Sequence, residues 1–112
     1  AMVFGAFLAS QAVVTARDER TGALVAVARA TSDGKVAWVY DVMVRADLRG
    51  SGAGSAVMEL LLDHPAVRVA RHVRLTTRDA MAFYRRIGFL ELDEVPRHAS
   101  RLVDMVRAGG PT

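Results

Sequence analysis

The first half of the chain consists of short apolar segments separated by polar turns. Residues 11–18 and 23–30 are rich in small and β-branched side chains and are divided by a polar stretch, which is typical of two β-strands. The second segment leads into Asp33-Gly34, a strong hairpin signal because glycine readily adopts the positive φ that tight turns need. Residues 36–44 are therefore expected to pair antiparallel with the second strand. Since this third run is apolar at nearly every position, we expect it to be buried on both faces at the centre of the sheet.

The spacing of apolar residues changes after the third strand. Over residues 54–63 they recur at helical intervals, which predicts a helix with one apolar face. This helix should end before Pro65, because the residue preceding a proline is pushed out of the α region. Residues 67–69 are expected to be irregular. Residues 72–77 should then form a strand parallel to the third one, reached by a right-handed crossover.

A second amphipathic helix is predicted over residues 80–87, where apolar side chains recur at i, i+3, i+4 and i+7. Thr77 or Asp79 is its expected N-cap, and Gly88 is placed to end it in the left-handed conformation. The helix therefore carries signals at both ends.

The ends of the chain have a less clear pattern. Residues 3–9 fit either the last turns of a helix or a short edge strand, and both alternatives stay open. Residues 89–95 and 101–107 are predicted to form a closing antiparallel pair, followed by a mobile tail at residues 108–112. Because there is no repeat and no composition shift, residues 1–112 are expected to form a single domain.

A glycine-rich turn joins the third strand to the first helix. Gly50, Gly52 and Gly54 alternate there, so backbone N–H groups can converge on one anion, and the positive end of the helix adds to the attraction. A diphosphate fits this description. The dinucleotide-binding fingerprint does not fit, because residues 72–78 hold no acidic side chain for a ribose. A nucleoside-triphosphate loop would need a lysine after its last glycine, and Lys35 is the only lysine of the chain.

Composition argues against several other classes of site. The chain of 112 residues has no cysteine, so no disulfide, thiol nucleophile or thiolate metal site is expected. His64, His72 and His98 lack the spacing of metal ligands, so we expect no metal. The net charge of +3 is scattered along the chain and the apolar runs are short, so neither nucleic acid nor a membrane is an expected partner. These features suit a cytoplasmic enzyme.

Two motifs together resemble one known family. Residues 49–54, with the sequence R-G-S-G-A-G, resemble the R/Q-x-x-G-x-G/A signature by which GNAT-superfamily acetyltransferases hold the pyrophosphate of acetyl-coenzyme A. Residues 80–89, with the sequence A-M-A-F-Y-R-R-I-G-F, are similar to the A-x-x-x-Y-x-x-x-G-F segment of the same family. The motifs stand in the family's order, and the resemblance covers roughly residues 11–107.

The resemblance implies an α/β fold of the GNAT type. Its mixed, mostly antiparallel central sheet would carry helices on both faces, in the order β-β-β-α-β-α-β-β. Family members have another strand and one or two helices before the first strand found here, and we expect these elements to be missing. A truncated sheet would leave an unpaired edge and an apolar helix face, so the expected assembly is a homodimer.

The resemblance also implies where acetyl-coenzyme A binds. Main-chain N–H groups near Met43 would polarise the thioester carbonyl, and Arg49 would contact phosphate largely through its main chain. Thr77 stands where many family members have an asparagine that contacts the cofactor arm. The predicted cofactor-binding residues are Val42, Met43, Val44, Arg49, Gly50, Ser51, Gly52, Ala53, Gly54, Ser55 and Thr77.

Tyr84 has two interpretations. Its place on the apolar stripe of the second helix suits a core aromatic residue whose hydroxyl finds some partner. The resemblance implies instead a catalytic acid that protonates the departing thiolate of coenzyme A, as a phenol is able to do.

Asp41 also has two interpretations, because it lies in an otherwise apolar strand where a carboxylate is costly unless paired or hydrated. It is either the structural partner of an arginine such as Arg29 or Arg74, or, as in resembling enzymes, a general base acting on the acceptor ammonium through water. Burial would raise its pKa towards the range of a base. In a regular strand its neighbour Tyr40 would point to the opposite face.

The function that the resemblance implies is acetyl-coenzyme A-dependent N-acetyl transfer by direct attack of an amine on the thioester. The acceptor would be a small-molecule or peptide amine, which no motif of this chain identifies. The alternative is a non-catalytic acyl-coenzyme A-binding or regulatory module, in which the glycine loop binds the cofactor and no acceptor is acetylated.

Overall fold

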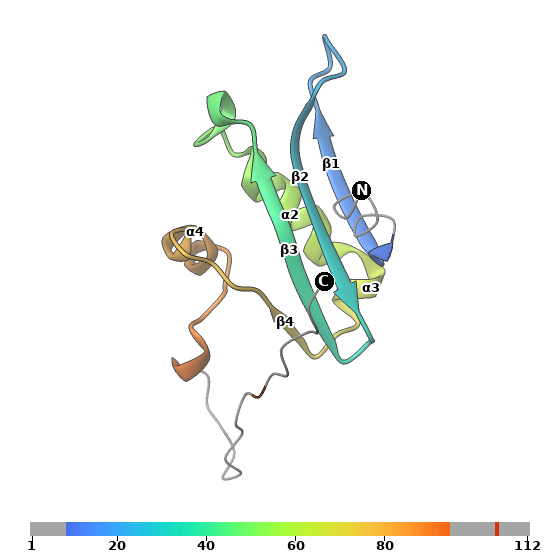
Figure 1. Ribbon diagram of the computed structural model, residues 1–112, viewed down its shortest axis with the longest axis vertical. Helices are drawn as coiled ribbons and strands as arrows, with labels where there is room; N and C mark the ends of the chain where they lie inside the picture. The colour runs from blue at the N-terminus through green and yellow to red at the C-terminus, as the bar shows by residue number, and fades with distance from the viewer. Residues whose placement is uncertain (1–8, 95–104, 106–112) are drawn as a thin grey trace, which may run out of the picture. The chain divides into compact units, whose positions relative to one another are not determined.

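The computed structural model describes residues 9–94 and residue 105, and the chain divides into two compact units, Ala1–Arg78 and Asp79–Thr112. The first unit holds a four-stranded sheet in the order β1-β2-β3-β4 (Figure 1). Its strands are β1 (Ala12–Arg17), β2 (Leu24–Ser32), β3 (Val36–Val44) and β4 (His72–Arg74). Its helical elements are the 3-10 turn η1 (Ala46–Leu48), α2 (Ala53–Asp63) and α3 (Pro65–Arg68). The second unit contains α4 (Met81–Arg86) and the 3-10 turn η2 (Leu92–Glu94).

The sheet is mixed and mostly antiparallel, as expected. β2 pairs antiparallel with both β1 and β3, whereas β3 and β4 run parallel. The turn between β2 and β3 is the predicted hairpin at Asp33-Gly34. Asp33 Oδ1 accepts hydrogen bonds from the backbone N–H groups of Lys35 at 2.8 Å and Val36 at 3.0 Å. A short-range side-chain contact thus determines this hairpin.

Helix α2 packs on the sheet mainly over β1 and β2 (Figure 1). Its Val57, Met58 and Leu61 side chains are buried. Most buried positions of the sheet are alanines: Ala12, Ala26, Ala28, Ala30 and Ala37. Because alanines project so little, the large side chains that fill the interface come from the helix.

The junction between α2 and α3 follows from two residues. His64 ends α2 in an extended conformation, with φ −61° and ψ 135°, as the proline behind it requires. Pro65 then starts α3, where its missing N–H is tolerated, and His64 Nδ1 accepts a hydrogen bond from the Ala66 N–H at 3.1 Å. The predicted end of the first long helix is confirmed. The irregular stretch expected at residues 67–69 is partly helical instead.

The expectation that the third strand is buried on both faces was wrong. β2 is the strand with consecutive buried residues, from Val25 to Ala28, whereas Tyr40 and Met43 of β3 are 39% and 51% exposed. The cause lies in β4, which is shorter than predicted and pairs with β3 only from Val36 to Trp38. Within the described residues, β3 therefore has one strand neighbour over its second half.

Helix α4 of the second unit ends in a Schellman motif. Gly88 has φ 103° and its N–H donates to the Arg85 carbonyl at 3.1 Å, while the Phe89 N–H donates to the Tyr84 carbonyl at 3.0 Å. The rings of Tyr84 and Phe89 meet edge to face at 5.8 Å, the apolar contact that accompanies this motif. The predicted role of Gly88 is confirmed. The predicted N-cap was wrong, because Ala80 holds that position without a side-chain hydrogen bond.

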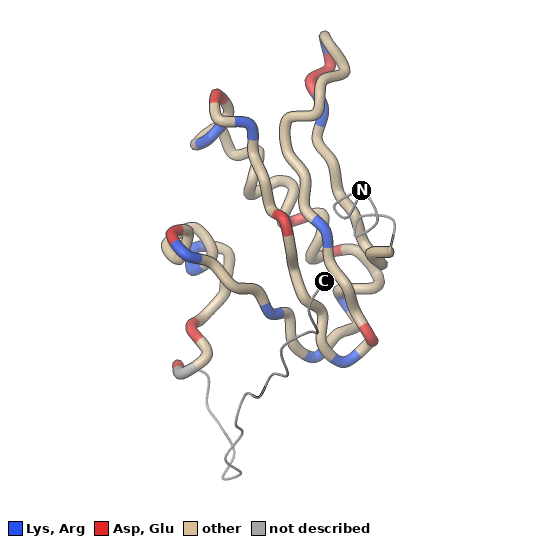
Figure 2. The backbone as a smooth tube through the Cα atoms, in the orientation of Figure 1, with Lys and Arg blue, Asp and Glu red and all other residues tan. Residues whose placement is uncertain are grey.

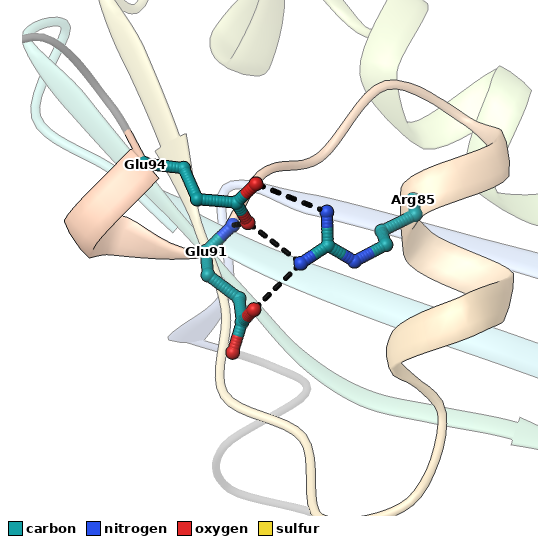
Figure 3. A network of polar contacts seen from close by, with 3 residues as sticks. All are labelled: Arg85, Glu91 and Glu94. Carbon is teal, nitrogen blue, oxygen red and sulfur yellow. Dashed lines mark hydrogen bonds and ion pairs between the residues drawn. The ribbon is translucent and has the colours of Figure 1, made fainter.

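Residues 89–94 do not form the predicted strand, and Arg85 provides the physical reason. Its Nη2 donates to Glu91 Oε2 and Glu94 Oε1, each at 2.6 Å, and its Nη1 donates to Glu94 Oε2 at 3.3 Å (Figure 3). Glu94 Oε1 also accepts from the Glu91 N–H at 3.1 Å. These contacts hold the segment in a turn instead of an extended strand, and they lower the pKa of Glu94 below its ordinary value.

Several expectations concern parts of the chain that are not described. The partner strand at residues 101–107, apart from residue 105, lies outside the described residues, as do the tail at residues 108–112 and residues 3–8. Over the described part, the observed order is β-β-β-α-α-β-α with two 3-10 turns. None of the helices in this part is long and apolar enough to cross a membrane.

Candidate functional site

The glycine-rich turn follows β3 and runs through η1 into α2, as predicted. Gly50 has φ 80°, and Gly52, the N-cap of α2, has φ 93°. A Cβ atom placed on Gly52 would meet no described atom within 4 Å. Packing against the described residues therefore does not require glycine here. Positive φ requires it, and so would a ligand that comes close to the backbone.

Backbone donors are left open around this turn. Within the described residues, the N–H groups of Gly50, Gly52, Gly54 and Ser55 donate to no acceptor, and that of Ala53 makes only a 3.4 Å contact with Ser51 Oγ. The first turn of α2 contains no acidic side chain that would offset the positive end of its dipole. Open donors and an unopposed helix dipole together favour an anion at this position.

Neighbouring side chains give the turn its shape. Arg45 and Asp47 form a two-pronged ion pair, with Nε to Oδ1 at 2.6 Å and Nη2 to Oδ2 at 3.1 Å, which lowers the pKa of Asp47. The Ser51 hydroxyl donates to the Leu48 carbonyl. Within the described residues, the exposed Arg49 side chain forms no ion pair and no hydrogen bond. The acid nearest the loop is thus neutralised by Arg45, and the cation of the predicted motif is left available.

Basic residues do not gather on one element. Lys and Arg positions are spread along the whole described chain, with Asp and Glu positions between them (Figure 2). The attraction for an anion at the loop therefore depends on local geometry, with Arg49 as an additional charge.

A β-bulge interrupts β3 shortly before the loop. Val27 pairs with Met43 and Arg29 pairs with Tyr40, so Ala28 alone lies opposite two residues, 41 and 42. Asp41 has φ 54°, and within the described part of the chain it is the one non-glycine residue with positive φ. A bulge leaves one residue without its regular ladder partner, so it changes the direction of main-chain groups next to it.

Asp41 pairs with Arg29, which was one of its two predicted interpretations. Arg29 Nε lies 2.6 Å from Asp41 Oδ2, and the guanidinium also lies 4.6 Å from the centroid of the Tyr40 ring. Asp41 is 44% exposed, so the expected burial was wrong. Tyr40 and Asp41 contact the same arginine although they are neighbours in one strand, because the bulge turns Asp41 away from its regular direction. Arg74, the other predicted partner, lies 4.8 Å from the Trp38 ring instead.

Tyr84 lies on α4 in the second unit and is half-buried. Its ring packs edge to face against Phe83 at 5.0 Å, and against Phe89, as a core aromatic would. Burial raises its pKa above the ordinary value of 10.0, so the phenol stays protonated at neutral pH. Its hydroxyl has no hydrogen-bond partner among the described residues. Both predicted interpretations remain compatible with these contacts.

Comparison with known proteins decides the family. The sequence profile of the Acetyltransferase (GNAT) family matches residues 4–89, which include the glycine loop and the Tyr84 segment. The chain belongs to the GNAT acetyltransferase family. The match to such a large share of the chain also explains why two motifs separated by a helix and a strand occur together.

Individual relatives agree with this assignment. The chain is 33% identical over 82 residues to an uncharacterized N-acetyltransferase, ycf52, of Porphyra purpurea, a match that covers 67% of this chain and 44% of the relative. It is 38% identical over 74 residues to the chloroplastic GCN5-related N-acetyltransferase 1 of Arabidopsis thaliana, covering 64% and 38%. The chain thus spans less than half the length of these two relatives.

A solved structure extends the comparison to the fold. A GNAT-family acetyltransferase from Streptococcus pneumoniae superposes with a TM-score of 0.73 at 26% identity, covering 92% of this chain and 78% of the other. The predicted fold class, a GNAT-type mixed and mostly antiparallel sheet with helices, is therefore confirmed.

The predicted site residues are divided between the two units of this GNAT chain. Residues 42–55 form one continuous stretch from the bulge to the start of α2, within the first unit. Thr77 is exposed and lies beyond the end of β4, and Tyr84 belongs to the second unit. Within the described residues, no group of three His, Asp or Glu side chains is arranged to hold a metal ion.

Sequence reasoning missed two features of this GNAT chain. The bulge has one sequence signal, a lone Asp41 inside an apolar strand, and its ion pair gives that signal a structural meaning. The second is an open hollow of about 250 Å³ at the hairpin end of the sheet, lined by Gln11, Thr31, Ser32, Asp33, Val36 and Trp38. None of the predicted site residues lines it.

Proposed function

We propose that this chain binds acetyl-coenzyme A and transfers its acetyl group to an amine. The observation that carries the proposal is the set of open N–H donors at the positive end of α2, next to Arg49. The two linked phosphate groups of the cofactor can accept hydrogen bonds from neighbouring backbone N–H donors, and the glycines let these phosphates approach the backbone. Within the described residues, the second half of β3 has no strand neighbour on the side of β4, so it offers further main-chain groups to the rest of an extended cofactor.

The reaction would proceed by direct attack. The amine nitrogen bonds to the thioester carbonyl carbon, the carbon–sulfur bond breaks, and the thiolate leaves with a proton. Main-chain N–H groups near Met43 would stabilise the negative charge that develops on the carbonyl oxygen. Tyr84 would supply the proton to sulfur, a role that needs the neutral phenol, and burial raises its pKa further above the ordinary value of 10.0. The amine loses a proton to water, directly or with help from Asp41.

A calorimetric titration with acetyl-coenzyme A tests the binding site. Gly52→Asp places bulk and negative charge where phosphate would approach, so binding should be lost. Gly34→Asp is the matched control, because Gly34 also has positive φ, 89° against 93°, and its Cβ would also meet nothing within 4 Å. Unchanged affinity in a folded Gly52→Asp protein would locate the site elsewhere.

A thiol-release assay then tests the reaction. Free coenzyme A should form when acetyl-coenzyme A is mixed with an acceptor from a panel of small primary amines and peptides with free N-termini. Binding without thiol release across the whole panel would favour the alternative of a non-catalytic acyl-coenzyme A-binding or regulatory module.

We also propose that the chain works as a homodimer, in the cytoplasm. β1 is one of the two edge strands of the described sheet, and Leu60 on α2 is 60% exposed. An open edge and exposed apolar side chains both favour self-association. Sedimentation equilibrium should report twice the mass of the chain, and a monomer at all accessible concentrations would contradict the proposal.

A further inference from the structure

Asp41 holds a backbone conformation that few residues adopt readily. Its φ of 54° places it in the left-handed region, where glycine, asparagine and aspartate are the common occupants. It adopts this conformation at the bulge of β3, one residue before the main-chain groups of residues 42–44. The conformation of residue 41 therefore determines the direction in which these groups point.

Arg29 contacts the bulge from the adjacent strand. Its backbone lies opposite Tyr40, its Nε donates to Asp41 Oδ2 at 2.6 Å, and its guanidinium stacks on the Tyr40 ring at 4.6 Å. Its Nη1 also donates to Ser10 Oγ at 3.2 Å. The Arg29 side chain is only 14% exposed, so it is packed in place and not a mobile surface group.

We propose that Arg29 is a positioning residue, whose ion pair with Asp41 fixes the bulge and so orients the main-chain N–H groups that receive the thioester carbonyl. This inference rests on the proposed acetyl transfer. Asp41 then serves to form and hold the bulge, and water takes the proton of the acceptor amine.

Aspartate meets two requirements at this position. It tolerates positive φ better than most residues, and its carboxylate reaches Arg29 across the strand pair. Glycine would meet the first requirement alone, and alanine would meet neither. Asparagine would meet both in part, because its amide oxygen still accepts from Arg29 Nε while its side chain cannot act as a base.

This difference separates positioning from base catalysis. We expect Asp41→Asn to keep kcat within about threefold, and Asp41→Ala and Arg29→Gln to lose about tenfold or more in kcat with little change in KM for acetyl-coenzyme A. Asp41→Gly should fall between Asn and Ala. Loss of activity in Asp41→Asn equal to that in Asp41→Ala, with loss of the acidic limb of the kcat pH profile, would overturn the proposal in favour of a base.

Arg74→Gln is the matched control, since Arg74 stacks on Trp38 at 4.8 Å much as Arg29 stacks on Tyr40. It should leave kcat unchanged, and a loss equal to that of Arg29→Gln would contradict a specific role for Arg29. Circular dichroism confirms that each variant is folded.

A second readout does not depend on activity. Amide proton and nitrogen chemical shifts of Val42 and Met43 should move in Arg29→Gln and stay in place in Arg74→Gln. Unmoved shifts in Arg29→Gln would overturn the proposal. If the wild-type chain transfers no acetyl group, the proposed function fails, and these shifts still decide whether Arg29 fixes the bulge.

Discussion

Two helix ends with a glycine at positive φ differ in what surrounds the glycine. At Gly88, behind α4, the exposed backbone groups are satisfied by the Schellman hydrogen bonds, and the adjacent Arg85 is held by two carboxylates. At Gly52, in front of α2, several N–H donors are open and the adjacent Arg49 has no ion pair within the described residues. A glycine at positive φ thus ends a helix in one place, and in the other it begins a helix at the proposed anion site. The state of the surrounding donors and charges distinguishes the two uses.

The largest effect should come from adding one methyl group at each glycine. Gly52→Ala should weaken acetyl-coenzyme A binding by about a hundredfold, because the Cβ would lie where the proposed phosphate site meets the backbone and the positive φ becomes strained. Gly88→Ala should lower the free energy of unfolding by about 1 kcal/mol and leave the affinity unchanged. Calorimetry and urea unfolding measure the two quantities. Equal losses of affinity in both variants would remove the distinction between the two glycines.

The next effect concerns Tyr84, which precedes Arg85 on α4. Tyr84→Phe should lower the single-turnover rate of acetyl transfer by about ten- to a hundredfold while affinity and stability are kept, since only the donor hydroxyl is removed. Because burial raises the pKa of Tyr84, the phenol should stay protonated up to its ordinary pKa of 10.0, and the wild-type rate should not fall through loss of this acid below that pH. An unaltered rate in the variant, with chemistry rate-limiting, would return Tyr84 to a purely structural role.

A smaller effect should separate the two arginines. Arg49→Gln should weaken acetyl-coenzyme A binding about five- to tenfold and reduce its dependence on salt, without changing the thermal midpoint Tm. Arg85→Gln should lower Tm and leave the affinity unchanged. Binding isotherms at two salt concentrations and thermal melts are sufficient. If Arg85→Gln weakened binding and Arg49→Gln lowered Tm, the ion pairs of Arg85 would not identify it as the arginine that stabilises the fold.

The smallest effect is the pH dependence of that stability. The pKa of Glu94 is lowered in the folded chain by Arg85, so its contribution is complete above the ordinary value of 4.5 and is lost as the pH falls through the lower folded value. The Tm difference between wild type and Arg85→Gln should therefore be constant near neutral pH and shrink below pH 4.5. Melts between neutral and acid pH measure it. A difference that persists in strong acid would point to lost packing of the Arg85 side chain.

The elements that could be predicted from the sequence depend on contacts between near neighbours. The hairpin at Asp33-Gly34, the end of α2 before Pro65 and the C-terminal glycine of α4 are each determined within a few residues. The predicted strand at residues 89–95 was wrong because Arg85 reaches forward six and nine residues to two glutamates. The pattern of apolar and polar residues, from which the strand was predicted, carries no information about such a side-chain contact.

The candidate site likewise has one part that could be predicted from near neighbours in the sequence and one part that could not. The glycine loop could be predicted because the glycines, the arginine and the helix start are consecutive in the sequence. The bulge could not, since the left-handed conformation of Asp41 goes with a partner twelve residues away on another strand. The interpretation of Asp41 as buried assumed a regular strand covered on both faces, and the short β4 leaves that half of β3 partly open.

The alanines of the sheet have a consequence for how the loop can be tuned. A helix that rests on a smooth surface of methyl groups is kept in register by its own few large side chains, here Val57, Met58 and Leu61. We expect a change of volume at one of these side chains to shift α2 as a rigid body, so that the N–H donors at its N-terminus move with it. Substitutions far from the proposed cofactor site, such as Val57→Ile, which adds one methylene group, should thereby change cofactor affinity in small steps from within the hydrophobic core.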